Sequence, residues 1–151
     1  MTDAISELKI RARILQRGQA VPTQLKVCLS TVSRELGFAG WRHACRVLRG
    51  EITDEGFGDV LYPRGGSAYL NHWFARHDEA RSFRAERGGH LLAYRKQFFV
   101  TGPDFIAHLG LDPDDAEWAR LGWDWGCAGQ EAARARLYDR LLGARGCMVT
   151  P

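Results

Sequence analysis

Hydrophobic residues recur every three to four positions through the first fifty residues, which is the spacing of one face of an α-helix. The three successive stripes are Leu8, Ala12 and Leu15; Leu25, Cys28, Leu29, Val32 and Leu36; and Trp41, Ala44, Cys45 and Leu48. Thr2 or Asp3 can cap the first helix and Thr23 the second, because their side-chain oxygens accept hydrogen bonds from free backbone amides. Gly37, followed by the apolar Phe38, fits the residue in left-handed conformation that commonly ends an α-helix. The pattern therefore predicts three helices within residues 1–50.

Short apolar runs and amphipathic helices alternate in the rest of the chain. Ser67 can cap a helix predicted over 68–87, and alternating apolar residues predict a strand over 91–100. The strand partner is expected at 59–62, after an acidic, glycine-rich loop. Further helices are predicted from 103, from Pro113 behind a cap at Asp112, and over 128–142.

These elements predict a mainly α fold of the α+β class. A three-helix module at 1–50 is joined to a body at 51–151, in which helices pack on a minimal two-stranded β pair. The change of composition at 51–66 marks the boundary. Because 151 residues is the size of one domain, we expect the module and the body to form one compact unit.

The first helices also carry a sequence pattern, LGFxxW, formed by Leu36-Gly37-Phe38 and Trp41. The accompanying positions are Leu8-Lys9, Ala12, Leu15, Gly18, Leu29, Val32 and Leu48. Residues 8–50 thereby resemble a short helical module of uncharacterised bacterial proteins, some of them assigned to the glyoxalase superfamily. Every matched residue is a core or cap position, so the resemblance implies a fold element. The resemblance does not imply glyoxalase activity, because the sequence shows neither the metal ligands nor the paired βαβββ units that the activity needs.

The second and third predicted helices can be compared with a DNA-binding helix-turn-helix. Gly37 fits the turn, and Val32 and Ser33 fit the first helix of such a motif. The usually buried position six residues after the glycine is His43, however, and Trp41 stands where a recognition helix presents polar side chains. The sequence predicts a tight turn between two helices. It does not support the recognition of DNA bases in the major groove by the second of these helices.

Charge is distributed unevenly along the chain, although the net charge is only +3. Residues 1–50 hold nine Lys or Arg against three Asp or Glu, and the remainder holds twelve against fifteen. A basic segment on a mildly acidic body is typical of nucleic-acid binding, although a solvated basic helix face gives the same pattern. The candidate nucleic-acid-binding residues are Lys26, Arg34, Arg42, Arg46 and Arg49.

A second candidate site precedes the helix predicted over 68–87. Its residues are Arg64, Gly65, Gly66 and Ser67. Free amides and the dipole at a helix start favour an anion such as phosphate, and Arg64 would add charge. A plain turn with a helix cap is the competing interpretation.

No spacing in the sequence predicts a metal or cofactor. The acids from Asp112 to Glu117 fit the start of a helix rather than a calcium loop. His72 and His77 are five residues apart, so they do not share a helix face. The cysteines at 28, 45, 127 and 147 form no CxxC pair, and free thiols fit a reducing compartment.

The sequence also bears on location. No apolar run approaches the roughly 18–20 residues that cross a bilayer, and the first residues do not form a secretory signal. We therefore expect a cytoplasmic protein with no membrane partner.

Three functions remain open from the sequence. The first is a non-enzymatic binding or regulatory protein that contacts nucleic acid through its basic helices. The second is a protein–protein interaction protein, as a homodimer or a partner inhibitor, with a Trp-rich C-terminal surface. The aromatic residues of that surface would be Trp118, Trp123, Trp125 and Tyr138. The third is a small enzyme with a site assembled around Arg64, His72 and Lys96.

Overall fold

The computed structural model describes residues 3–63 and 65–146. The helices are α1 (Ala4–Arg17), α2 (Leu25–Glu35), α3 (Trp41–Leu48), α4 (His77–Arg87), α5 (Pro103–His108), α6 (Ala116–Arg120) and α7 (Glu131–Gly146). The strands are β1 (His72–Phe74), β2 (His90–Tyr94) and β3 (Gln97–Thr101), and one 3-10 turn spans Gly66–Ala68. Helices dominate around one small antiparallel sheet, so the predicted α+β class is confirmed. Thr2, Arg64 and Cys147 lie outside the described residues.

The first three helices form where the sequence predicts them. Asp3 caps α1, since its side chain accepts a hydrogen bond from the Ser6 amide. The cap of α2 is Gln24, because Thr23 turns its hydroxyl to the carbonyl of Val21 instead. Gly37 has a φ of 93°, a left-handed value that glycine adopts readily. Asp59 also lies so close to Gly37 that the position has no room for a Cβ atom.

The sheet differs from the predicted two-stranded pair. Its strand order is β1-β3-β2, and both pairings are antiparallel. The apolar run 91–100 folds back on itself as the β2–β3 hairpin, with Tyr94 opposite Gln97. Residues 59–62 form no strand, so the predicted pairing is wrong. Val60 and Leu61 are buried in the core, which accounts for their apolar character without a strand.

The long helix predicted over 68–87 begins only at His77. Residues 72–74 form the edge strand β1 instead, in which side chains alternate between the two faces of the sheet. Trp73 contacts Phe99, whereas Phe74 contacts Phe83 of α4. Leu70, which the helical stripe would bury, is 82% exposed.

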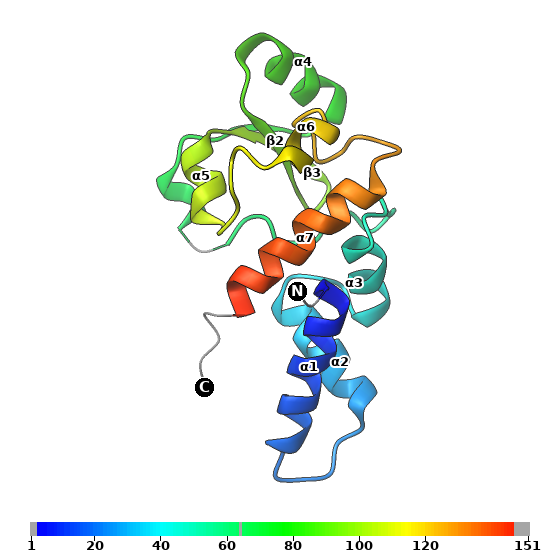
Figure 1. The fold of residues 1–151 in the computed structure, drawn as a ribbon. Coiled ribbons are helices and arrows are strands. Elements are labelled where there is room, and N and C mark those ends of the chain that lie inside the picture. The colour runs from blue at the N-terminus through cyan, green and yellow to red at the C-terminus, as the bar shows by residue number, and fades with distance from the viewer. Residues whose placement is uncertain (1–2, 64, 147–151) are drawn as a thin grey trace.

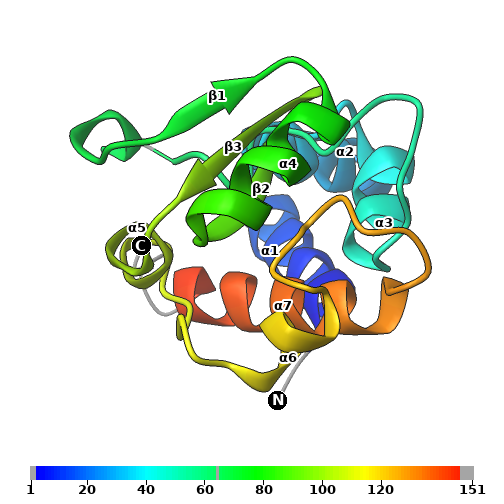
Figure 2. The same cartoon turned by 90° about the horizontal axis from the view of Figure 1, so that it is seen from above.

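The elements stack in layers. Figure 1 shows α4 on one side of the sheet and α7 on the other, with α1 and α2 extending beyond α7. In the view from above, α4 covers β2 and β3, and α3 lies beside α1 (Figure 2). The main core joins residues of α1, β3 and α7, among them Leu8, Phe99 and Leu137. Because this core contains residues on both sides of position 50, the first three helices and the later elements pack together.

Two details of the core depart from the sequence expectations. Trp41, whose place on the apolar stripe of the third helix predicts a core position, is half-buried at the edge of the core. The helix expected from Pro113 begins at Ala116, because Asp115 accepts the Glu117 amide and serves as its cap. Asp112 instead accepts the amide of Asp114 in the preceding turn.

Candidate functional site

Helix α3 presents a stripe of three arginines. Arg42 and Arg46 lie on α3 and Arg49 is its C-cap residue, and their spacing of i, i+4 and i+7 places them on one side of the helix. The side that faces the core holds His43, Ala44, Val47 and Leu48. Arg42 and Arg49 are exposed, and Arg46 is half-buried with its Nε 3.4 Å from an oxygen of Glu51.

Helix α1 presents a similar stripe. Lys9, Arg13 and Arg17 are spaced i, i+4 and i+8 and are exposed, whereas Leu8 and Ala12 are buried. None of these three cations lies within ion-pair distance of a carboxylate in the described part of the chain. The stripe is therefore free for contacts with solvent or with a partner.

The two stripes adjoin at Cys45. Burial raises the pKa of the Cys45 thiol, and the nearby charges of Arg49 and Lys9 act in the opposite direction. The charges of Lys9 on α1 and Arg49 at the end of α3 both reach this thiol, which lies where α1 and α3 pack together. We name the surface formed by Lys9, Arg13, Arg42, Arg46 and Arg49 the cationic face.

The two candidate residues of α2 differ in their relation to this face. The Nε of Arg34 donates to the carbonyl of Ala39 at 3.5 Å, which places its guanidinium beside the turn that precedes α3. Lys26 is exposed at the opposite end of α2, about 12 Å along the helix axis. The structure thus brings Arg34 next to α3 and leaves Lys26 apart.

His43 has a structural role at the base of the cationic face. Its Nδ1 accepts the Ala39 amide at 3.0 Å, and its Nε2 then donates to the carbonyl of Gly56 at 2.8 Å. The ring is buried with both nitrogens bonded. His43 therefore fixes the start of α3 against the segment that follows the first three helices.

The candidate anion site lacks the helix on which the prediction rests. Gly65 adopts the left-handed conformation, and Gly66 to Ala68 form one 3-10 turn that leads into an extended residue. Without an α-helix after Ser67 there is no helix dipole for an anion to meet. Arg64 is not among the described residues.

Of the predicted enzyme site, the structure describes His72 and Lys96, and it places them apart. His72 lies on β1 against Phe83 and lines a hollow beside α5. Lys96 lies in the β2–β3 turn and lines a different hollow, together with His43 and Glu55.

The predicted Trp-rich surface is mostly core. Trp118, Trp125 and Tyr138 are buried, and the indole of Trp125 donates to the hydroxyl of Tyr138 at 3.0 Å. The indole of Trp118 donates to the carbonyl of Asp112. Trp123 alone of the four predicted aromatics is exposed, at 37%, and Arg84 lies over its ring.

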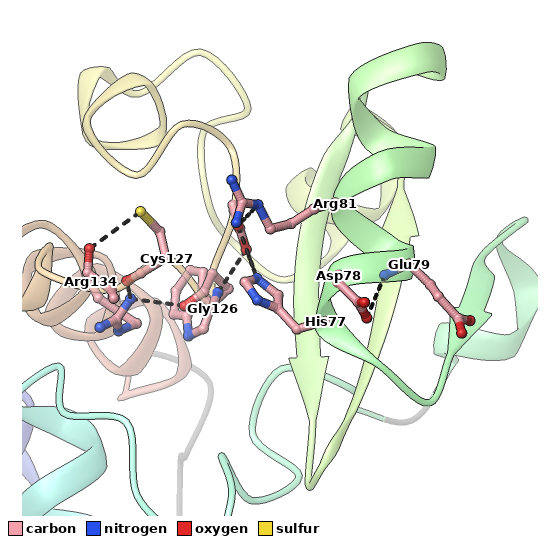
Figure 3. Close-up of polar contacts among 10 residues, drawn as sticks. His77, Asp78, Glu79, Arg81, Gly126, Cys127 and Arg134 are labelled. Carbon is pink, nitrogen blue, oxygen red and sulfur yellow. Dashed lines mark hydrogen bonds and ion pairs between the residues drawn. The ribbon is translucent and has the colours of Figure 1, made fainter.

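A polar cluster that the sequence analysis missed joins α4 to the segment between α6 and α7 (Figure 3). The Nε2 of His77 lies 2.8 and 3.0 Å from the two carboxylate oxygens of Asp124, and the Gly126 amide donates to the same carboxylate at 2.9 Å. A Cβ on Gly126 would stand 2.8 Å from the His77 ring, so glycine is required for this approach. No local spacing reveals the pair, because 47 residues separate its members.

Within residues 3–63 and 65–146, no group of three or more His, Cys, Asp or Glu side chains is placed to hold a metal ion. No helix among them has the length and apolar character needed to cross a membrane. Comparisons of the chain with protein-family models, curated proteins and solved structures gave no match.

Proposed function

We propose that the protein is a non-enzymatic, cytoplasmic binding or regulatory protein that contacts nucleic acid through the cationic face. The observation that carries the proposal is the number of unpaired cations on α1, α2 and α3. Of the nine Lys and Arg residues in this part of the chain, only Arg11 and Arg46 lie within 4.0 Å of a described carboxylate. The remaining seven are exposed.

The later part of the chain uses its arginines differently. Six of them form ion pairs with carboxylates: Arg76, Arg81, Arg95, Arg120, Arg136 and Arg140. Arg134 and Arg145 donate to backbone carbonyls. Exposed guanidinium groups without such partners are therefore concentrated on the first three helices, where phosphate oxygens can accept their hydrogen bonds.

The spacing of these cations favours contacts with the phosphate backbone. Arg42, Arg46 and Arg49 span two turns of α3, and Lys9 and Arg13 continue the charge onto α1. Phosphate contacts carry no information about base sequence, so we expect binding that is general rather than sequence-specific. Nonspecific binding of this kind has a Kd of roughly 10⁻⁴–10⁻⁶ M at physiological salt.

A fluorescence-anisotropy titration with mixed-sequence DNA and RNA at several salt concentrations tests the proposal. The double variant Arg42→Gln/Arg49→Gln removes two charges from the cationic face. The matched control, Arg87→Gln/Lys96→Gln, removes two exposed charges elsewhere. We expect the first variant to weaken binding and to reduce the slope of log K against log salt by about 2, because each lost phosphate contact lowers that slope by about 0.9.

The control variant should retain most of the wild-type slope. Absence of binding at low salt would contradict the proposal. Equal losses in the two double variants would show that only net charge matters, and the cationic face would then have no specific role.

A further inference from the structure

A hollow of about 480 Å³ lies between α4 and the segment that joins α6 to α7. Ala85 and Cys127 line its less polar side, with the fully buried Leu91 and Leu121 beneath its surface, and Arg81, Ser82 and Arg84 of α4 line its polar side. Small-molecule sites in proteins have this volume and this combination of an apolar wall with a few polar groups. The hollow is separate from the cationic face, which lies on α1 and α3.

The acidic residues that line the hollow already have hydrogen-bond partners. Asp124 accepts from the Gly126 amide and pairs with His77 (Figure 3). Asp78 accepts from the Nε and Nη2 of Arg76, at 3.1 and 2.8 Å. Both carboxylates therefore already have donors other than Arg81 and Arg84.

The arginines of the hollow, in contrast, keep free donors. The Nε of Arg81 is 3.7 Å from Asp124, which is too far for a hydrogen bond. Arg84 uses its Nε for the carbonyl of Gly89, and no described residue accepts from its two terminal nitrogens. Because the two arginines are three residues apart on α4, their guanidinium groups share one side of the helix.

The backbone conformation of Trp123 places its ring against the guanidinium of Arg84. Its φ is 55°, a left-handed value that a bulky residue rarely adopts. Hydrogen bonds hold it there, since its amide donates to Trp118 and its carbonyl accepts from Leu91. The Trp123 ring then lies 5.0 Å below the guanidinium of Arg84 and orients that group in advance of any ligand.

We propose that this hollow binds a small organic anion. Its carboxylate would accept hydrogen bonds from Arg81 and Arg84, and its short apolar body would lie against Ala85 and Cys127. A guanidinium matches the geometry of a carboxylate, and Arg76 offsets the charge of Asp78, so the charges of Arg81 and Arg84 stand against that of Asp124. The site requires neither the cationic face nor nucleic acid.

Protection of Cys127 from alkylation tests this proposal in the wild-type chain. Cys127 lines the hollow, whereas Cys45 lies on α3 and serves as an internal control. Iodoacetamide alkylation would be followed at each cysteine by peptide mass mapping in the presence of hexanoate, hexanamide or acetate. Hexanamide lacks the charge of hexanoate, and acetate lacks its apolar body.

We expect hexanoate to slow alkylation of Cys127 saturably, to about half at a concentration equal to its Kd, and to leave Cys45 unchanged. Hexanamide and acetate should protect far less. Arg81→Gln/Arg84→Gln should abolish the protection by hexanoate, and Arg87→Gln on the same helix should retain it. Equal protection by hexanoate and hexanamide, or no protection at millimolar hexanoate, would overturn the proposal, and either result is obtained without any variant. Nucleic-acid binding by Arg42 and Arg49 would be unaffected by that failure.

Discussion

Arg134 provides a direct test of how the first three helices are held to the rest of the fold. Its side chain is fully buried, and it makes four hydrogen bonds to three backbone carbonyls. Two of these bonds reach Gly50, at 2.9 and 2.7 Å, directly after α3. The others reach Trp125 and Cys127, at 2.9 and 2.8 Å. One side chain thus joins α7 to α3 and to the segment before α7.

The change Arg134→Met keeps similar length and removes all four donors. Each hydrogen bond to a charged group contributes about 1.5–3 kcal/mol, and buried carbonyls without a partner add a further cost. Removing the guanidinium also relieves its desolvation, which in the native fold lowers the pKa of Arg134. Weighing these opposing effects, we expect a net loss of about 3 kcal/mol, a large share of the roughly 5–15 kcal/mol typical of a domain.

Urea denaturation of wild type, Arg134→Met and Arg134→Lys measures this loss. Lysine retains the charge, but its single nitrogen cannot reach three carbonyls in the fork geometry of arginine, so most of the loss should remain. Arg13→Met, an exposed change on α1, is the control and should alter stability by less than about 0.5 kcal/mol. A loss below about 1 kcal/mol for Arg134→Met would refute the reasoning, because the three carbonyls would then have other partners.

Two further predictions concern pH and backbone geometry. The hydrogen bond from Arg136 holds the pKa of Glu117 below its ordinary value of 4.5, so the unfolded chain binds more protons and stability is lost as pH falls below that value. Thermal melts should show a lower Tm for Glu117→Gln at neutral pH and a flatter decline between about pH 5 and pH 3, whereas the exposed Glu55→Gln should follow wild type. Gly50→Ala would place its Cβ 2.0 Å from the carbonyl oxygen of Glu131 at a φ of 91°, so we expect loss of folding or at least about 3 kcal/mol. Gly88→Ala, at a φ of 76° with open space around it, should cost only about 1–2 kcal/mol, and similar losses for the two glycines in urea denaturation would contradict the geometry.

The helices of the N-terminal part were predictable because their signals are local. Asp3, Gly37 and the apolar stripes act within one or two turns, and tertiary contacts reinforce them. Residues 68–76 were mispredicted because Leu70, Trp73 and His77 also fit a helical spacing. Residues 72–74 form a strand instead because they pair with β3, some 25 residues farther along the chain. The spacing of apolar residues within a segment does not reveal a pairing partner so distant in sequence.

The candidate sites were likewise predictable only where their residues are close together in the sequence. The spacing of Arg42, Arg46 and Arg49 is readable from the sequence, whereas the position of Lys9 relative to them depends on how α1 packs against α3. Composition also gave the wrong location for Trp118 and Trp125. A count of aromatics does not distinguish a core from an interface, and both residues are buried.

Amide chemical-shift mapping tests the central claim most directly. Titration of the ¹⁵N-labelled protein with a short mixed-sequence duplex should perturb amides of α1 and α3, around Lys9, Arg13, Arg42, Arg46 and Arg49, in proportion to the bound fraction. Added salt should reverse the perturbation, because phosphate contacts release counterions. Shifts concentrated on α4 or on the β2–β3 turn, with α1 and α3 unchanged, would contradict the assignment of the cationic face as the nucleic-acid interface.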